Sequence, residues 1–198
     1  PMTNSPDDFI LLEQTFRKAG EKGLLVYDIM TERFEITTII QKELSNIPEL
    51  FGELQPGSPD KPGITKESVH CFFKYVSGNP LKRPAWFFDT QQQGEGLVDV
   101  STHLVDLVMW EAFPDQILNR EDVELVSARR WQTEMDGDMF EKVTGYGKFP
   151  DFLKPNVEDG ILNGFPNGEI ICRLKGIYAK TSVTWNYPST KCSTRCSR

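Results

Sequence analysis

The sequence predicts an α+β domain with a mixed or mainly antiparallel sheet covered by helices, preceded by the end of another unit. Three observations lead to this fold class. The chain opens with a helical pattern that is followed by a short apolar run. Much of the chain after residue 48 shows the alternating or continuously apolar patterns of β-strands. One strongly apolar helical pattern, over residues 94–114, interrupts those strands.

The opening segment predicts a helix that begins after Ser5 and ends at Gly20. Ser5 is a favourable N-cap residue, and Pro6 suits the first helical position. The apolar residues of this helix recur at helical spacing at Phe9, Leu12, Phe16 and Ala19. Residues 24–27 are uniformly apolar, and we expect them to form a short buried strand.

The rest of the chain predicts a second helix over residues 28–47, then strands on both sides of the central helix. The expected strands are residues 49–54, 68–76, 83–90 and 123–134, with two more meeting near Gly176 within 168–187. A short helical turn is expected over residues 139–143.

The central helix carries the residues with the clearest chemical potential. Asp99, His103 and Asp106 are spaced by four and three residues, so they share one face of an otherwise apolar helix. A carboxylate one turn before a histidine is suited to acid–base chemistry, because it can fix the tautomer of the ring. The alternative stays open that Asp99 only caps the helix and His103 is a core residue.

Composition narrows the function classes. The chain has 198 residues and a formal net charge of −7, which argues against a nucleic-acid or anionic-membrane partner. It contains only two histidines, so a histidine-rich metal site is excluded. A metal hydrolase site built on Asp99, His103 and Asp106 stays conceivable, but zinc usually takes more nitrogen or sulfur ligands, so we expect no metal. The sequence has no Walker A motif, no G-x-S-x-G, no H-E-x-x-H and no G-x-G-x-x-G after a strand.

The four cysteines leave the redox compartment open. Cys71 and Cys172 lie in apolar runs and are expected to be small buried hydrophobic residues. Cys192 and Cys196 lie in a polar tail, and we assign them no role.

Several segments in order resemble the Gfo/Idh/MocA family of NAD(P)-dependent oxidoreductases. The chain is most similar to the C-terminal portion of a bacterial subgroup called putative oxidoreductases. The segments that carry the resemblance are Arg33-Phe34, the FGEL of residues 51–54, and a D-x-x-x-H motif formed by Asp99 and His103. The resemblance covers the chain to about residue 187. The family's E-K-P motif would precede the first helix, and Pro1-Met2 is either its remnant or a non-native end.

The resemblance implies a domain organisation. Residues 1–30 would be the last helix–strand unit of a Rossmann-type nucleotide-binding domain, and residues 31–188 the α+β substrate and oligomerisation domain. Residues 189–198 would be a disordered or non-native tail. NAD or NADP would bind the full-length parent, with none bound to this fragment, which we expect to be catalytically inert alone.

The resemblance also implies site residues. His103 would act as acid–base on a substrate hydroxyl, and Asp99 would position the substrate or the histidine. The further candidates for contacts with a polyol are Arg33, Lys74, Asp89 and Asp106, for each of which an ordinary ion-pair or surface role stays open.

The implied substrate is a small sugar or cyclitol, and the implied partner is a second copy bound through the sheet, with neither nucleic acid nor membrane. A cytoplasmic location is favoured, and a periplasmic one requires a signal upstream. Two alternatives from other classes stay open, which are a non-catalytic carbohydrate-binding or oligomerisation module and an NAD-dependent glycoside hydrolase of the same family.

Overall fold

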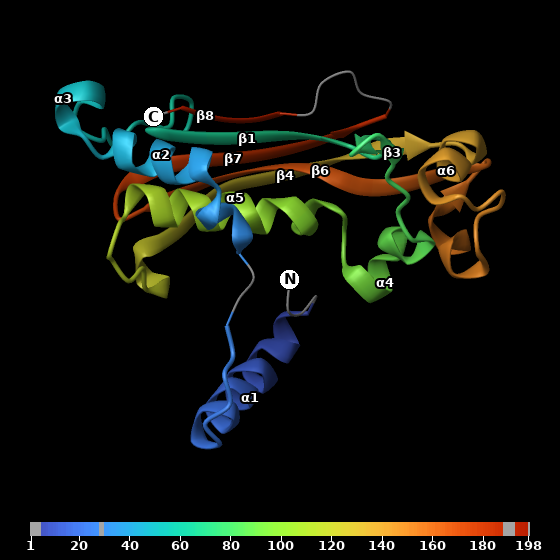
Figure 1. Ribbon diagram of the computed structural model, residues 1–198, viewed down its shortest axis with the longest axis horizontal. Helices are drawn as coiled ribbons and strands as arrows, with labels where there is room; N and C mark the ends of the chain where they lie inside the picture. Colours follow the sequence, from blue (N-terminus) through green and yellow to red (C-terminus); the bar gives the residue numbers. More distant parts are fainter. Residues whose placement is uncertain (1–4, 28–29, 188–192, 198) are drawn as a thin grey trace.

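A mixed sheet is the centre of the fold. The computed structural model describes residues 5–27, 30–187 and 193–197. It contains a six-stranded sheet in the order β4-β6-β7-β1-β8, with β5 paired to β6 (Figure 1). The strands are β1 (Ile64–Cys71), β4 (Val123–Met135), β5 (Val157–Glu158), β6 (Ile161–Leu174), β7 (Ile177–Asn186) and β8 (Ser193–Ser197). Strand β1 is parallel to β7 and all other pairs are antiparallel, so the predicted α+β class with a mixed sheet is confirmed.

The β6–β7 hairpin forms where the sequence predicts it. Lys175 and Gly176 connect the strands, with φ of 46° and 89° respectively. Two central residues with positive φ are typical of a type I′ turn, whose twist matches that of the strands it joins. In β7, Ala179, Val183 and Trp185 are buried at alternate positions, as the period-2 pattern predicts.

Helix α5 (Leu97–Ala112) lies along one face of this sheet and corresponds to the predicted central helix (Figure 1). Its buried side chains include Leu104, Leu107 and Val108. The core forms two clusters. Leu104 packs in one with Phe140 and Trp185, and Val108 packs in the other with Phe113. Because α5 is apolar on most sides, only its short polar stripe is left to face a cleft.

The remaining elements surround this core. Helix α2 (Ile36–Ser45) lies beside α5, and α3 (Pro48–Phe51) and α6 (Gly137–Thr144) lie toward opposite ends of the sheet (Figure 1). The other elements are η1 (Pro6–Asp8), α1 (Phe9–Glu21), η2 (Thr31–Phe34), β2 (Tyr75–Val76), β3 (Asn79–Pro80), η3 (Ala85–Phe88), α4 (Thr90–Gln93), η4 (Arg120–Asp122) and η5 (Asp151–Asn156). Among the described residues, no helix is both long enough and apolar enough to span a membrane.

Three predicted elements differ in the structure. The helix predicted over residues 28–47 is divided by Glu35, whose extended backbone separates η2 from α2. The strand predicted over 49–54 is instead the short helix α3, because Pro48 occupies its first turn. The strand predicted over 83–90 is replaced by η3 and α4, since Asp89 caps α4 by accepting a hydrogen bond from the backbone N–H of Gln91.

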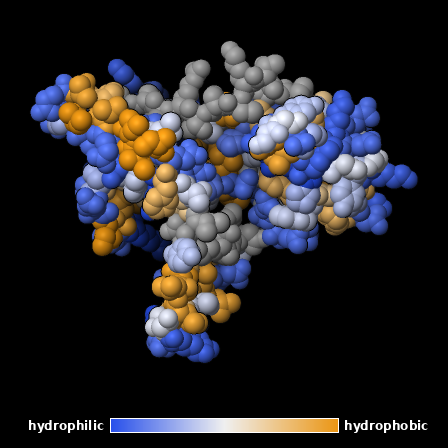
Figure 2. Space-filling view, in the orientation of Figure 1, coloured by the Kyte–Doolittle hydropathy of each residue, from blue (hydrophilic) through white to orange (hydrophobic). Residues whose placement is uncertain are grey.

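The N-terminal segment forms the predicted helix but lacks the predicted strand. No residue of α1 is buried, and Leu25 is 90% exposed. Residues 24–27 pair with no strand among the described residues. The predicted strand is therefore absent, because a strand needs a neighbouring strand for its backbone hydrogen bonds. Figure 2 shows the resulting apolar surface on α1.

The C-terminal tail and Cys71 also depart from expectation. Residues 193–197 form the edge strand β8, antiparallel to β1, where the sequence predicts a disordered or non-native tail. Cys71 is disulfide-bonded, so it is more than a small buried hydrophobic residue, whereas Cys172 is free. The partner of Cys71 lies outside the described side chains, as do Cys192 and Cys196.

Candidate active site

A polar cleft of about 490 Å³ lies between α5, β1 and the segment that joins η2 to α2. Helix α5 contributes Asp99 and His103, and β1 contributes Ser68 and His70. Trp185 of β7 lines the same cleft, which is also bordered by Glu32, Glu35, Lys74 and Arg83. The cleft therefore brings both histidines of the chain together with three carboxylates and three cationic side chains, the third being Lys66 of β1.

His103 lies against a carboxylate that the sequence did not indicate. Its Nδ1 is 2.7 Å from Oε2 of Glu32, in η2, and the contact is ionic, because neither atom forms a hydrogen bond of acceptable geometry. Asp99, which we expected to position the ring, lines the cleft one turn earlier, and no contact between the two side chains is recorded. The negative charge of a carboxylate beside Nδ1 favours the tautomer that carries its proton there, which leaves Nε2 to exchange a proton.

The second histidine, His70, is held in its neutral form. Its Nε2 lies 2.8 Å from the Ser68 hydroxyl, and its ring packs against Trp185 with centroids 4.9 Å apart. Burial lowers the pKa of His70 to about 4, and the charges of Lys74 and Arg83 add to this effect. His70 is therefore uncharged at neutral pH and contributes only hydrogen bonds to the cleft.

Arg83 is fixed by aromatic rings instead of by a carboxylate. Its guanidinium carbon lies 4.7 Å from the ring centroids of both Phe87 and Trp185. The guanidinium donates hydrogen bonds of 3.4 Å to the backbone carbonyls of Cys71 and Phe72. Burial lowers the pKa of Arg83, while the nearby charge of Asp99 raises it, so the side chain stays cationic. The sequence, in which residues 83–90 are predicted to form a strand, did not indicate that Arg83 would lie in this cleft.

Comparison with known proteins assigns the family. The family model described as "Putative oxidoreductase C terminal domain" matches residues 40–196. The chain belongs to this family. It is also similar to the crystal structure of a putative oxidoreductase from Parabacteroides merdae, with 52% identity and a TM-score of 0.92. That similarity covers 99% of this chain and 46% of the other, so the chain spans about half the length of its solved relative. No match was found among curated proteins.

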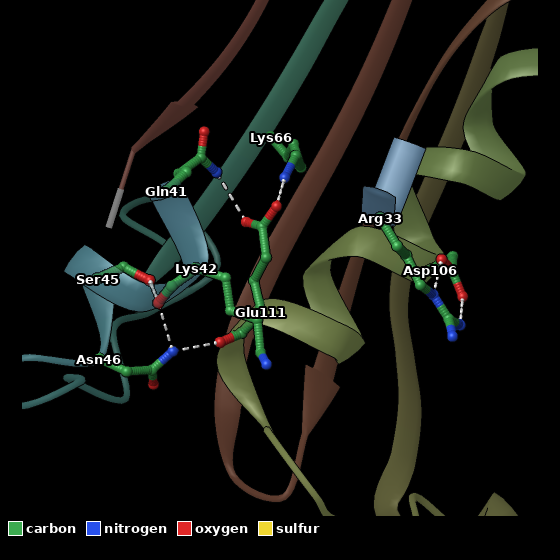
Figure 3. Close-up of polar contacts among 8 residues, drawn as sticks. All are labelled: Arg33, Gln41, Lys42, Ser45, Asn46, Lys66, Asp106 and Glu111. Carbon is green, nitrogen blue, oxygen red and sulfur yellow. Dashed lines mark hydrogen bonds and ion pairs between the residues drawn. The ribbon is translucent and has the colours of Figure 1, made fainter. Parts of the chain in front are cut away.

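Two of the expected polyol-binding residues of this oxidoreductase C-terminal domain bind each other. The guanidinium of Arg33, in η2, donates two hydrogen bonds to Asp106 of α5, one of them 2.7 Å long from Nε to Oδ2 (Figure 3). Neither residue is among those that line the polar cleft. Arg33 and Asp106 therefore fasten η2 onto α5, and this contact sets Glu32 beside His103.

The other two expected residues have different places. Asp89 lies outside the lining of the cleft and caps α4. Lys74, by contrast, lines the cleft directly after β1. Of the six residues singled out in the sequence, Asp99, His103 and Lys74 thus meet in one cleft.

A buried ion pair closes one side of the oxidoreductase domain's cleft. The ammonium of Lys66 in β1 pairs with the carboxylate of Glu111 at the end of α5, and their side chains are 3% and 8% exposed. The side-chain amide of Gln41, in α2, donates to the second oxygen of Glu111 at 2.7 Å, so α2 is tied to the same carboxylate (Figure 3). Beyond this wall lies an apolar groove of about 540 Å³, bordered by Ile40, Leu44 and Phe51.

The described residues of the domain offer no ready place for a metal or a dinucleotide. In the described part of the chain, no three His, Cys, Asp or Glu side chains gather as metal ligands. The described glycines before α5 follow a helix and a loop, whereas a dinucleotide fold uses a glycine-rich turn between a strand and a helix. We therefore assign neither a metal nor a nicotinamide contact to this chain's residues.

Proposed function

We propose that this domain binds the substrate and moves the proton in an NAD(P)-dependent sugar or cyclitol oxidoreductase. The single observation that supports this proposal most is the contact between Glu32 and Nδ1 of His103 in a polar cleft. It is found in a chain that belongs to an oxidoreductase family and carries the D-x-x-x-H motif.

The proton chemistry follows from the ring's surroundings. Oxidation of a secondary alcohol removes one proton from oxygen and one hydride from carbon. His103 can accept the hydroxyl proton at Nε2, because Glu32 faces the other ring nitrogen, Nδ1. A nicotinamide bound to the full-length protein would supply the hydride acceptor. Asp99 faces the same cleft and can accept a hydrogen bond from a neighbouring substrate hydroxyl.

A polyol fits the remaining lining of the cleft. Glu35, Ser68 and Asp99 present hydrogen-bond acceptors, and Trp185 supplies an apolar surface on which a sugar ring can pack. The cofactor site and the substrate's second wall would come from the longer chain, since the solved relative is about twice as long.

We also propose that residues 1–30 belong to the nucleotide-binding domain of the longer protein. The apolar side chains Phe9, Ile10 and Phe16 of α1 are exposed, as are those of residues 24–27. Such a surface is larger than a folded helix usually presents to water, which favours its burial against another domain.

A homo-oligomer through the sheet is the proposed assembly. The sheet face opposite α5 carries ion pairs that run across four strands, from Arg129 to Glu169, from Glu169 to Lys180, and from Lys180 to Glu67. A face with both charge signs can pair with its own copy across a two-fold axis. Sedimentation velocity of the full-length protein should show a dimer or tetramer that weakens at high salt. A monomer at every salt concentration would contradict this assembly.

The experiment that tests the oxidoreductase proposal uses the full-length protein. The purified protein is denatured, any released nucleotide is identified by mass spectrometry, and the native protein is followed at the NADH absorbance band during addition of sugars and cyclitols. We expect bound NAD or NADP, reduced by one member of the panel. Sugar release without net reduction would indicate the glycoside hydrolase instead. No nucleotide, even after incubation with NAD and NADP, would contradict both and favour a binding or oligomerisation module.

A further inference from the structure

We propose that Lys74 and Arg83 form an anion-binding subsite, so that the substrate is a sugar derivative carrying a carboxylate or a phosphate. This inference rests on the proposed function and narrows its substrate class. The subsite lies in the polar cleft, and its two cations come from the chain segments on either side of the small β2–β3 hairpin.

The first support is that both cations lack a carboxylate partner. Among the described residues, neither Lys74 nor Arg83 takes part in an ion pair. The other cations near the cleft are compensated, because Lys66 pairs with Glu111 and Arg33 with Asp106. A half-buried guanidinium without a counter-ion is costly, and a bound anion would compensate it.

The second support is the rigid presentation of Arg83. Two aromatic rings hold its guanidinium, and its recorded hydrogen bonds go only to backbone carbonyls at the long distance of 3.4 Å. A planar guanidinium fixed in this way keeps donors available for a bidentate contact with a carboxylate or a phosphate.

The charges that face Arg83 define the orientation of a ligand. Asp99 approaches from α5 without forming an ion pair with Arg83, and its carboxylate lies on the same helix as His103. Neutral His70, which both cations affect, adds no charge to the cleft. The cleft therefore holds the carboxylates of Glu32 and Asp99 as well as the cations of Lys74 and Arg83. A substrate whose anionic group binds Lys74 and Arg83 would have one preferred orientation in the cleft relative to His103.

Calorimetric binding to the full-length protein tests the subsite without requiring turnover. The ligands are matched sets of one hexose in neutral, uronic acid and 6-phosphate form, for glucose and for galactose. We expect one charged form to bind at least about tenfold more tightly than its neutral partner, as charge-assisted hydrogen bonds predict. The carboxylate and phosphate arms then tell which anion the subsite takes.

Variants assign that preference to the two residues. R83Q and K74Q should each weaken binding of the charged form by about tenfold, while R83K, which keeps the charge, should recover part of the loss. K148Q removes an exposed lysine elsewhere and should change nothing. Affinity of the charged form should also fall as salt is raised.

The outcomes separate this inference from the proposed function. Equal binding of neutral and charged forms, equal losses of both forms in R83Q and K74Q, or no binding of any ligand would overturn the subsite. Oxidation of a neutral sugar in those cases would leave the oxidoreductase proposal intact. Binding of a charged form that depends on Arg83, without nicotinamide reduction by any compound, would support the subsite and count against the proposed redox chemistry.

Discussion

Glu32 and His103 are separated by about seventy residues in the chain, yet Oε2 of one lies 2.7 Å from Nδ1 of the other. The ion pair between Arg33 and Asp106 fastens the adjacent residue of η2 to the same helix. Two successive residues of η2 therefore contact α5 next to His103, Glu32 at the histidine itself and Arg33 at Asp106.

Glu32 is predicted to position His103 for proton transfer. E32Q removes the charge but keeps the shape, and should lower kcat of the full-length enzyme by about tenfold to a hundredfold with little change in KM. E49Q is the matched control, because Glu49 is an exposed glutamate of α3 that lies outside the lining of the cleft. Equal kcat in E32Q and the wild-type enzyme would remove the role assigned to Glu32.

The Lys66–Glu111 pair is predicted to stabilise the domain only as an intact unit. K66M leaves a buried carboxylate without its cation and should lower the free energy of unfolding by about 3–5 kcal/mol, measured by urea denaturation. The double variant K66M/E111L removes both charges and should be closer to the wild-type protein. R173Q, which breaks an exposed pair with Glu124, should cost no more than about 1 kcal/mol. A K66M loss as small as that of R173Q would contradict this account.

The pKa of His70 makes stability depend on pH. It is lowered from 6.5 to about 4 in the folded domain, so between these values the unfolded chain binds more protons than the folded chain. The contribution of His70 is therefore fully present above about pH 6.5 and is lost as the pH falls toward 4. NMR titration of the imidazole should give the lowered pKa, and urea denaturation of H70Q should show a weaker loss of stability over this range. A pKa of His70 near 6.5 would refute the prediction.

Cys71 and Cys172 should differ in their reaction with iodoacetamide. The protein is denatured without reductant, alkylated, digested and analysed by mass spectrometry. Cys172 is free and should be labelled at once, whereas Cys71 is disulfide-bonded and should be labelled only after reduction. Labelling of Cys71 before reduction would show that the disulfide is absent in the purified protein. If the disulfide is present, an oxidising compartment becomes the expected location of the protein.

The parts of the fold that were predictable have strong local patterns. Helix α5 and the β6–β7 hairpin follow from apolar periodicity and from the turn at Gly176. Short apolar segments were misassigned, because their periodicity does not distinguish a strand from a single helical turn, as at α3 and η3. Residues 24–27 have no strand to pair with in the described structure. Whether such a partner strand exists cannot be read from the local sequence.

The candidate site was predictable only in its central helix. Asp99 and His103 follow from their spacing on α5, whereas Lys74 was a candidate only through the family resemblance and lies after the end of β1. Glu32 and Arg83 reach the cleft from segments distant in sequence, so their roles depend on tertiary packing. The pairing of Arg33 with Asp106 has the same origin, because each residue alone resembles an ordinary surface charge.

The most direct test of the central claim compares the only two histidines of the chain, which line the same cleft. The rate of nicotinamide reduction is measured in single turnovers of the full-length enzyme with its saturating substrate, for H103Q and for H70Q. The account predicts that H103Q lowers this rate by about a hundredfold to ten-thousandfold, while H70Q lowers it by less than about tenfold. A rate for H103Q close to that of the wild-type enzyme would contradict the assignment of His103 as the proton acceptor.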